Sequence, residues 1–570
     1  MGNRLNTVGI GIQDFLELRE NHKFYIDKTS FIKEWWESGD SVTLITRPRR
    51  FGKTLNMSML EKFFSVDYAE RGDLFQGLSI WEDEKYQTLQ GTYPVISLSF
   101  ASIKENNYEA ARLRIYQILM ELYDKHNYLL NSNMLTENEK EFYLSIKMDM
   151  KEVEATIAIY KMADFLSRYY GKKTIILLDE YDTPMQEAYV NGYWKELVSF
   201  TRSLFNATFK TNPYMARGIM TGITSVSKES VFSDLNHLEV VTTTSDKYAT
   251  FFGFTEEEVF LALDANGLGV EKEKVKEWYD GFIFGKYKDI YNPWSIINFL
   301  DKGEYRAYWA NTSSNSLVSK LIREGAKQIK TEFEALLRGE KLICPIDEQI
   351  VYSQLNGSKA AIWSLLLASG YLKVISRERY DEIEEGRRPE YELDITNFEV
   401  RCMFETMVQG WFDEAEGEYG DFLKALLLGD LKAMNHYMKR VTLQVFSYFD
   451  TGKGKFGDEP ERFYHGFVLG LLVDLRRDYI VTSNRESGFG RYDVTIEPKD
   501  KMKDAIIIEF KVRDLEDEKS LSDTVEKALA QIEEKQYEAN LIAKGIKKGK
   551  IRKYGFAFEG KNVLIGDGFI

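Results

Sequence analysis

Short apolar runs recur in the first half of the chain, each with the length of a buried strand. Four of them lie at 42–46, 95–100, 174–178 and 218–223, and an earlier run, 24–29, also reads as a strand. Long segments with helical periodicity separate the later runs. This alternation is typical of a parallel sheet covered by helices on both faces. The pattern therefore predicts an N-terminal α/β domain with a parallel sheet.

The pattern changes after the last of these runs. Residues 254–340 read as mainly helical, whereas the next stretch combines a helix at 360–369 with strands at 371–375 and 391–394. A helix followed by paired strands fits a winged-helix module, and a helical spacer is the alternative. A further helical stretch, 421–446, leads to the last segment, in which short strands and helices alternate again.

Composition narrows the class of protein. With 570 residues the chain is too long for one core, and its 44% hydrophobic and 29% charged residues are typical of a soluble globular protein. The two cysteines, Cys344 and Cys402, exclude a disulfide framework and a zinc cluster. The start has no apolar signal stretch, and apolar runs such as 467–473 are too short to span a membrane. We therefore expect a cytoplasmic protein that does not bind membranes.

The formal net charge of −15 argues against a protein that coats nucleic acid nonspecifically. It does not exclude a nuclease, because a metal site needs carboxylates of its own. Two local basic stretches, 47–53 and 544–553, could contact phosphate. For the second stretch, the alternative is a solvated loop and strand edge.

A phosphate-binding loop is predicted at 47–54, Arg-Pro-Arg-Arg-Phe-Gly-Lys-Thr, between a strand and a helix. Backbone N–H groups and the helix N-terminus would hold the phosphates of ATP, Lys53 would neutralise them, and the Thr54 hydroxyl would bind Mg²⁺. The generic motif has Gly where this chain has Arg47, so the alternative is a basic surface loop. The predicted cofactor-binding residues of the loop are Arg49, Arg50, Gly52, Lys53 and Thr54.

A matching acidic pair, Asp179 and Glu180, follows the apolar run 174–178. An aspartate at the carboxyl end of a buried strand can hold Mg²⁺ through water, and the adjacent glutamate can orient or deprotonate the attacking water. The alternative is a strand that simply exits into a polar loop. Thr224 follows the next run, and we predict that it senses the γ-phosphate of bound nucleotide.

A second constellation lies near the C-terminus. Glu509 and Lys511 follow the apolar run 505–508, and strand alternation puts both side chains on one face. Asp493 lies in 492–496, which reads as the neighbouring strand of a hairpin. Asp493 and Glu509 can bind Mg²⁺, which activates a water, while Lys511 positions that water or offsets charge. The alternative is an exposed antiparallel ribbon with surface charges.

Two helices could add to this second site. Glu461 heads an amphipathic run and could supply a third carboxylate, whereas His465, one turn later, is interpreted as packing or capping. Gln531 and Lys535 lie one helical turn apart and could contact phosphate. We include Glu461 and Gln531 among the predicted catalytic residues.

Several motifs of the N-terminal half resemble those of the predicted AAA-like ATPases. The matching stretches are 25–29, 47–54, 178–182, 228–230, 252–254 and 291–295. In that family Arg is the usual residue at the position of Arg47, so the departure from the generic loop is a family trait. The resemblance implies that the chain binds and hydrolyses ATP with Mg²⁺.

The segment 460–558 resembles the PD-(D/E)XK nuclease domain that accompanies this ATPase family. The matching stretches are 461–467, 483–488, 490–493, 509–511, 528–532 and 554–558. The resemblance implies a restriction-endonuclease-like core of helix, three-stranded meander, helix and strand. It also implies metal-dependent cleavage of nucleic acid, since the expected acidic and lysine positions are intact.

These features predict an ATP-dependent protein whose Mg²⁺-dependent nuclease domain cleaves DNA under nucleotide control. RNA is the alternative substrate, and a switch-type signalling NTPase whose C-terminal domain only binds nucleic acid is the alternative function. Homo-oligomer formation stays open. The predicted division is a P-loop AAA-like ATPase core at 1–253, a helical lid region at 254–344, a winged-helix-like or helical spacer at 345–450 and a nuclease domain at 451–570.

Overall fold

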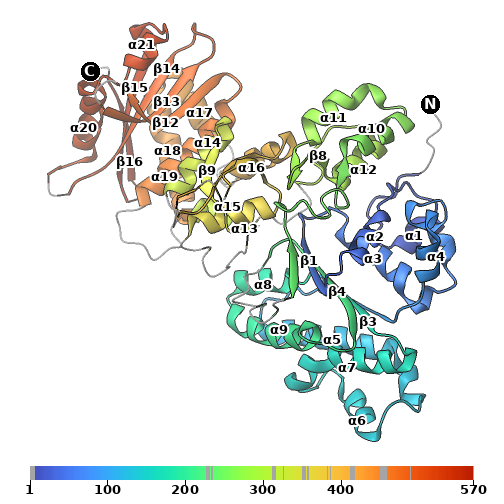
Figure 1. Cartoon of the computed structure of the whole chain (residues 1–570). Coiled ribbons are helices and arrows are strands. Elements are labelled where there is room, and N and C mark those ends of the chain that lie inside the picture. The colour runs from blue at the N-terminus through green and yellow to red at the C-terminus, as the bar shows by residue number, and fades with distance from the viewer. Residues whose placement is uncertain are drawn as a thin grey trace. The chain divides into compact units, whose positions relative to one another are not determined.

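The computed structural model divides the chain into two compact units (Figure 1). The N-terminal unit comprises Met1–Val318 and Gly339–Arg401, and the C-terminal unit comprises Ser319–Arg338 and Cys402–Ile570. The four domain segments predicted from the sequence are finer than this division and stay a prediction. The structure describes residues 7–225, 232, 235, 237–310, 316–324, 327–348, 355, 358–379, 381, 383–384, 387–410, 418–449, 459–487, 490–515, 517–560 and 562–568. It describes only the backbone at 316, 324, 327, 418, 443–449, 459–465, 484–487 and 490–493.

The N-terminal unit is built on a five-stranded sheet whose neighbouring strands are all parallel. The strands are β1 (Val42–Thr46), β2 (Val95–Ser99), β3 (Thr174–Asp179), β4 (Met215–Gly222) and β5 (Leu238–Val241). Their order is β2-β3-β4-β1-β5. The predicted parallel sheet is therefore confirmed, and β1 to β4 coincide with predicted apolar runs. Strand β5 was not predicted, since its four residues include an exposed glutamate and form no continuous apolar run.

Helices cover both faces of this sheet. The helices of this part of the chain are α1 (Phe15–Glu20), α2 (Ser30–Glu37), α3 (Lys53–Phe64), α4 (Glu84–Leu89), α5 (Tyr108–Lys125), α6 (Glu137–Ser145), α7 (Glu152–Tyr170), α8 (Thr183–Asn191) and α9 (Trp194–Phe209). Trp35 of α2 and Leu60 of α3 pack with Ile45 and Leu177 of the sheet in one core. Helices α5, α7 and α9 lie on the opposite side of the sheet (Figure 1). Both faces of the strands are thus buried, which explains their continuous apolar runs.

The run 24–29, predicted as a strand, forms no strand in the structure. Asp27 accepts hydrogen bonds from the backbone N–H groups of Thr29 (2.8 Å) and Ser79 (2.7 Å), which turn the chain into α2. Phe24 and Ile26 pack against the apolar cluster of the segment that follows the sheet. The strand prediction is wrong because these apolar side chains pack against a mainly helical core, and the backbone forms no strand.

The segment predicted as a helical lid contains a small sheet as well as helices. Its elements are β6 (Phe254–Thr255), α10 (Glu256–Ala265), α11 (Lys272–Tyr279), β7 (Phe282–Phe284), β8 (Tyr287–Tyr291) and α12 (Pro293–Lys302). The three strands are antiparallel in the order β6-β8-β7. Aromatic residues, which favour strands, and Gly285, with a φ of 57°, favour the short hairpin of β7 and β8. The prediction of a mainly helical segment did not include this hairpin.

A second antiparallel sheet closes the N-terminal unit. Its elements are β9 (Leu342–Pro345), α15 (Lys359–Ala368), β10 (Leu372–Arg377) and β11 (Glu390–Ile395), with strand order β10-β11-β9. A helix followed by paired strands is therefore present, and the winged-helix assignment stays a prediction. Residues 371–395 hold eight acidic and five basic side chains, which does not favour a hairpin that contacts phosphate.

The C-terminal unit contains a five-stranded mixed sheet in the order β12-β13-β14-β15-β16. Its elements are α14 (Lys327–Arg338), α17 (Glu418–Leu428), α18 (Leu431–Phe449), α19 (Glu459–Leu475), β12 (Tyr479–Ser487), β13 (Gly490–Pro498), β14 (Ala505–Val512), α20 (Leu521–Glu534), α21 (Ala539–Ala543), β15 (Ile551–Glu559) and β16 (Asn562–Asp567). Strands β12, β13 and β14 form an antiparallel meander, and β15 is parallel to β14. The expected order of helix, meander, helix and strand is thus present. Among the described residues, no helix is long and apolar enough to cross a membrane.

Candidate nucleotide and nuclease sites

The predicted phosphate loop joins the end of β1 to the start of α3. Arg50 and Gly52 have left-handed backbone conformations, with φ values of 65° and 77°. Gly52 caps the N-terminus of α3, and a Cβ at this position would meet no atom within 4 Å. The glycine therefore provides the backbone turn and leaves free space beside the helix N-terminus, as an anion site requires.

Lys53 is the first residue of α3, and its side chain is buried. Its Nζ donates to the backbone carbonyls of Arg47 (3.0 Å) and Pro48 (2.9 Å). Burial lowers the pKa of the Lys53 ammonium, and the nearby carboxylates of Glu180 and Asp179 oppose this shift. The carbonyl groups of the loop thus hold the ammonium at the place where the sequence predicts a phosphate contact.

Thr54 and Asp179 contact each other, although 125 positions separate them. Thr54 Oγ1 donates to Asp179 Oδ2 over 2.7 Å, and Thr221 Oγ1 donates to the other oxygen of the carboxylate. Burial raises the pKa of Asp179, while both hydroxyl donors act in the opposite direction. A hydroxyl and a carboxylate at the carboxyl edge of a parallel sheet form an oxygen donor set that suits Mg²⁺. The residues present therefore fit the predicted metal site, and Thr221, which was not predicted from the sequence, also binds the carboxylate of Asp179.

Glu180 directly follows β3 and has a left-handed backbone, with a φ of 51°. Thr183 Oγ1 donates to Glu180 Oε2 over 3.0 Å. Glu180 lines the same cavity as Lys53 and Thr54. A carboxylate therefore lies where a group that orients the attacking water is expected.

Thr224 is fully buried, and it is not among the residues that line this cavity. Its backbone N–H and its hydroxyl both donate to Asp182 Oδ2, over 2.8 and 2.7 Å. Burial raises the pKa of Asp182, and the hydrogen bonds from Thr224 oppose the shift. Asp182 therefore ties the end of β4 to the segment after β3. A sensing role for Thr224 stays a prediction.

A cavity of about 500 Å³ opens beside the phosphate loop. Polar residues of its lining include Lys53, Thr54 and Glu180. Apolar residues of its lining include Ile12, Phe24, Ile26, Phe254 and Ile297. Such a combination suits a nucleoside triphosphate, because the base prefers an apolar pocket and the phosphates need fixed donors. These apolar lining residues could not be predicted as a set from the sequence, because they come from segments far apart in the chain.

Arg47 occupies the position at which the generic loop motif has glycine, and its side chain is fully buried. The guanidinium donates to the carbonyls of Thr46 (2.9 Å) and Thr242 (2.6 Å), and it lies 4.6 Å from the centre of the Phe284 ring. Burial lowers the pKa of Arg47 to about 9. This arginine therefore joins the carboxyl ends of β1 and β5, so its role in the structure is to support the loop.

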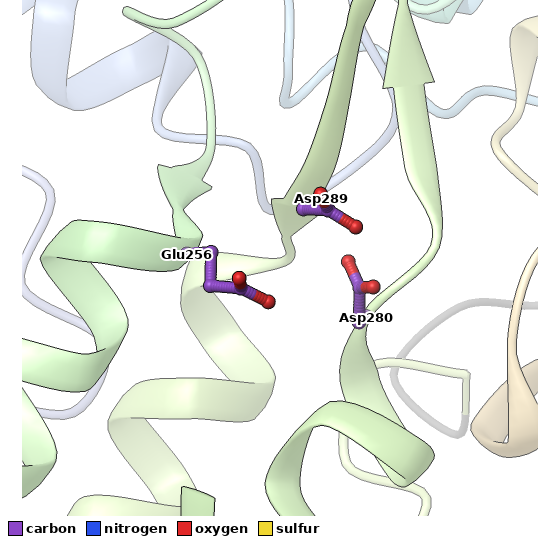
Figure 2. Close-up of side chains that lie close together, drawn as sticks. All are labelled: Glu256, Asp280 and Asp289. Atoms are coloured by element: carbon purple, nitrogen blue, oxygen red, sulfur yellow. The ribbon is translucent and has the colours of Figure 1, made fainter. Parts of the chain in front are cut away.

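Three carboxylates outside the cavity, those of Glu256, Asp280 and Asp289, lie close together (Figure 2). Their ligand oxygens are within 4.8 Å of one another. Lys276 Nζ pairs with Glu256 and lies 3.7 Å from Asp289 Oδ1. Burial and the hydrogen bond with Asp289 raise the pKa of Asp280 to about 7. Because an ammonium already balances part of this charge and all three side chains are partly exposed, we assign no metal to the cluster.

The second site lies on β14, where Glu509 and Lys511 share one face. Glu509 is buried, with 4% of its surface exposed. Strand β13 pairs antiparallel with β14, and Val494 lies opposite Ile508. Asp493 precedes Val494 and Glu509 follows Ile508, so these two positions are neighbours across the strands. The backbone thus brings the two predicted metal-binding positions to the same end of neighbouring strands.

Gln531 of α20 contacts both predicted catalytic side chains of β14. Its Nε2 donates to Glu509 Oε1 and, over 2.9 Å, to the Tyr537 hydroxyl. Lys511 Nζ donates to Gln531 Oε1 over 2.8 Å. The phosphate contact predicted for Gln531 from the sequence stays a prediction, and the structure shows that its amide binds both the carboxylate and the ammonium.

The side chains of Asp493, Glu461 and His465 lie outside the part of the chain that the structure describes. Their backbone positions are described. Asp493 lies on β13, and Glu461 and His465 lie in the first two turns of α19. The roles predicted for these side chains stay predictions.

The basic stretch 544–553 is largely paired with carboxylates. The pairs are Lys544 with Glu497, Lys548 with Glu538, Lys550 with Asp504, Arg552 with Asp504 and Lys553 with Glu533. These acidic neighbours reduce the positive potential that a phosphate would meet. They favour the solvated loop of the alternative interpretation for residues 544–550, whereas residues 551–553 lie on β15, which is an inner strand and no edge of the sheet.

Two protein-family models match the chain. The first, described as "Predicted AAA-ATPase", matches residues 9–232, and the second, "PD-(D/E)XK nuclease superfamily", matches residues 459–568. Over these two segments the chain is similar to both families. The AAA-ATPase match includes the phosphate loop and the Asp179 strand, and the PD-(D/E)XK match includes the whole mixed sheet. Both resemblances seen in the sequence are therefore confirmed.

A relative from Azotobacter chroococcum mcd 1, described as "Uncharacterized protein in vnfD 5′ region", is 25% identical over 396 residues. The match covers 69% of this chain and 68% of that protein. Among solved structures, the Aeropyrum pernix ORC2 protein (ADPNP-ADP complexes) matches at 9% identity with a TM-score of 0.22, over 67% of this chain and 92% of that one. This likeness is too low to carry an argument, so the assignment of the fold rests on the sheet topology and the family matches.

Proposed function

We propose that the AAA-ATPase domain binds and hydrolyses ATP with Mg²⁺, and that nucleotide controls cleavage of nucleic acid by the PD-(D/E)XK domain. The observation that carries the first part is the hydrogen bond between Asp179 and Thr54, which lines the cavity. It supports a magnesium nucleotide site because a loop hydroxyl and a strand-end aspartate must meet on one metal ion.

The residues around the cavity have distinct roles in this proposal. Mg²⁺, held by the Thr54 hydroxyl and through water by Asp179, would neutralise charge on the β- and γ-phosphates. Lys53 would exchange its carbonyl partners in the loop for phosphate oxygens. Glu180 would orient the attacking water, and the Thr183 hydroxyl would hold Glu180 in place.

The contacts among Glu509, Gln531 and Lys511 support phosphodiester cleavage in the second domain. Mg²⁺ bound by Glu509 and Asp493 would stabilise charge on the phosphate and lower the pKa of a bound water. Lys511 would position that water or offset the developing charge. Gln531 would keep Glu509 and Lys511 at the separation that this chemistry needs.

Charge supports a nucleic acid substrate for this domain. Residues 459–568 hold 20 basic and 21 acidic residues, so most of the net charge of −15 lies elsewhere in the chain. A nearly neutral domain repels a polyanion far less than the rest of the chain does. We propose DNA as the substrate, and RNA is the alternative because the same groups serve either polymer.

The test measures degradation of single- and double-stranded DNA and RNA with Mg²⁺ or Mn²⁺, with and without ATP. We expect metal-dependent DNA cleavage that ATP alters and that Lys511→Ala abolishes. Lys519→Ala, an exposed lysine beyond the site, is the control. Equal cleavage with and without ATP would contradict the proposal that nucleotide controls the nuclease domain. ATP turnover without any cleavage would favour the switch-type NTPase.

A further inference from the structure

Two helices continue from the N-terminal unit into the C-terminal unit, and both begin close to the phosphate loop. Helix α13 (Ser316–Glu324) passes the boundary after Val318, and α16 (Phe398–Gly410) passes it after Arg401. Val318 lines a small cavity of about 50 Å³ together with Arg49 of the loop and Trp309. The start of α13 therefore lies against the loop.

The backbone carbonyl of Arg49 accepts two side-chain hydrogen bonds from the segment after the main sheet. Trp309 Nε1 donates to it over 2.9 Å, and Asn292 Nδ2 donates over 3.3 Å. Asn292 also caps α12, because its Oδ1 accepts from the backbone N–H groups of Trp294 and Ser295. The position of the loop is thus coupled to Trp309 and to the start of α12.

Glu399, in the first turn of α16, binds the same two elements. Its Oε1 accepts the backbone N–H groups of Trp309 (2.5 Å) and Ala310 (3.4 Å), and its Oε2 accepts the Ser295 hydroxyl (2.8 Å). The side chain is fully buried. A buried acceptor that loses a donor leaves an unsatisfied polar oxygen, which costs free energy, so these bonds favour joint movement of the residues that they connect.

We propose that Glu399 is a positioning residue that passes the state of the phosphate loop to α16. This inference rests on the proposed function, in which the loop binds nucleotide. Phosphate would draw Lys53 away from the carbonyls of Arg47 and Pro48, so the loop backbone next to Arg49 changes its hydrogen bonds. The change reaches Trp309 through the Arg49 carbonyl and reaches α16 through Glu399.

The experiment measures hydrogen exchange of the full chain with Mg²⁺ and either ADP or a non-hydrolysable ATP analogue. Nucleotide is expected to change the exchange rate of residues 398–410 by about threefold or more. Glu399→Ala, which removes both acceptors, should abolish this change. Glu399→Gln should restore it, because its amide oxygen can accept from Trp309 and Ala310 while its NH₂ donates to Ser295.

A second pair of variants keeps the test valid if Glu399→Ala does not fold. Trp309→Phe removes only the indole N–H that binds the loop and should abolish the change at α16. Trp35→Phe is the control, because it removes a similar buried indole hydrogen bond, to Thr43 at 3.2 Å. This variant should still show the nucleotide-dependent change at α16. An undiminished change in Trp309→Phe, or nucleotide binding without any change at α16, would overturn the role proposed for Glu399. Neither result would contradict the proposed function. Absence of binding, measured with a fluorescent ATP analogue, would overturn the proposed function as well.

Discussion

The guanidinium of Arg47 donates to the carbonyl of Thr242 over 2.6 Å and so connects residues 195 positions apart. The same side chain binds the carbonyl of Thr46 and faces the Phe284 ring. It therefore ties the last residues of two neighbouring strands, β1 and β5, to the small sheet. A glycine at this position could make none of these contacts.

Arg47→Ala is expected to lower the free energy of unfolding of the N-terminal unit by about 2–4 kcal/mol, because several buried carbonyls lose a charged donor. Arg47→Lys should recover only part of this loss, since an ammonium lacks the planar fork of donors. Urea denaturation measures both. Arg217 is a half-buried control that donates to the carbonyls of Trp35 and Asp40. A loss in Arg217→Ala as large as that in Arg47→Ala would contradict the importance given to burial.

Gly52→Ala should weaken nucleotide binding by about tenfold or more, because a methyl group would occupy the space that we propose for phosphate and the left-handed backbone costs an alanine about 1–2 kcal/mol. Gly171→Ala is a matched control. Gly171 caps the end of α7 with a φ of 64°, and its Cβ would likewise meet no atom within 4 Å. Thermal unfolding should show similar losses in both variants. Equal nucleotide affinities would argue against a phosphate site at Gly52.

Gln531→Ala should reduce nucleic acid cleavage by about 10–100-fold, the usual cost of removing a side chain that orients metal-binding or catalytic groups. Initial rates at saturating Mg²⁺ provide the measurement. Glu526→Ala, an exposed position on the same helix, should cleave at the unchanged rate. Full activity of Gln531→Ala would mean that Glu509 and Lys511 hold their positions without the amide.

The pKa of Asp280, raised to about 7 by burial and Asp289, predicts a pH dependence of stability. The folded state favours the protonated carboxyl of Asp280. The contribution of this group to the free energy of unfolding is therefore complete below about pH 4 and is lost as the pH rises through about 7. The unchanged chain should therefore lose stability relative to Asp280→Asn over this range. The slope should stay below about 1.4 kcal/mol per pH unit, the limit for one proton, because the group is partly exposed.

Urea denaturation at several pH values between 4.5 and 7.5 measures this difference. Lys276, Lys373 and Tyr291 also face the cluster, and they remain in place in Asp280→Asn. Glu257→Gln, an exposed carboxylate of α10, controls for the general effect of removing a charge. Parallel pH profiles for the unchanged chain and Asp280→Asn would contradict the assignment.

The sequence predicts those parts of the structure in which the local pattern and the tertiary environment agree. Strands β1 and β3 are buried on both faces, so their apolar runs are continuous. Strand β5 has only four residues. Strands β7 and β8 form a short aromatic hairpin within a segment that was predicted as helical. In such elements the neighbours, rather than the local pattern, determine the conformation.

The same contrast applies to the sites. A motif of eight residues predicts a phosphate loop that includes Lys53 and Thr54, and strand alternation puts Glu509 and Lys511 on one face. Contacts such as that between Trp309 and the Arg49 carbonyl join positions 260 apart, and nothing local in the sequence indicates them. The partners that hold a site in place therefore emerge only from the folded chain.

The two compact units interleave along the chain, and this determines how the protein can be dissected. Helix α14 belongs to the C-terminal unit, yet residues 339–401 of the other unit follow it. Glu334 of α14 accepts a hydrogen bond from Ser483 of β12, and Phe333 packs edge-on against Phe404. A fragment that starts at Cys402 would lack these partners and expose apolar surface. Studies of an isolated nuclease fragment therefore need the α14 segment supplied by fusion or coexpression.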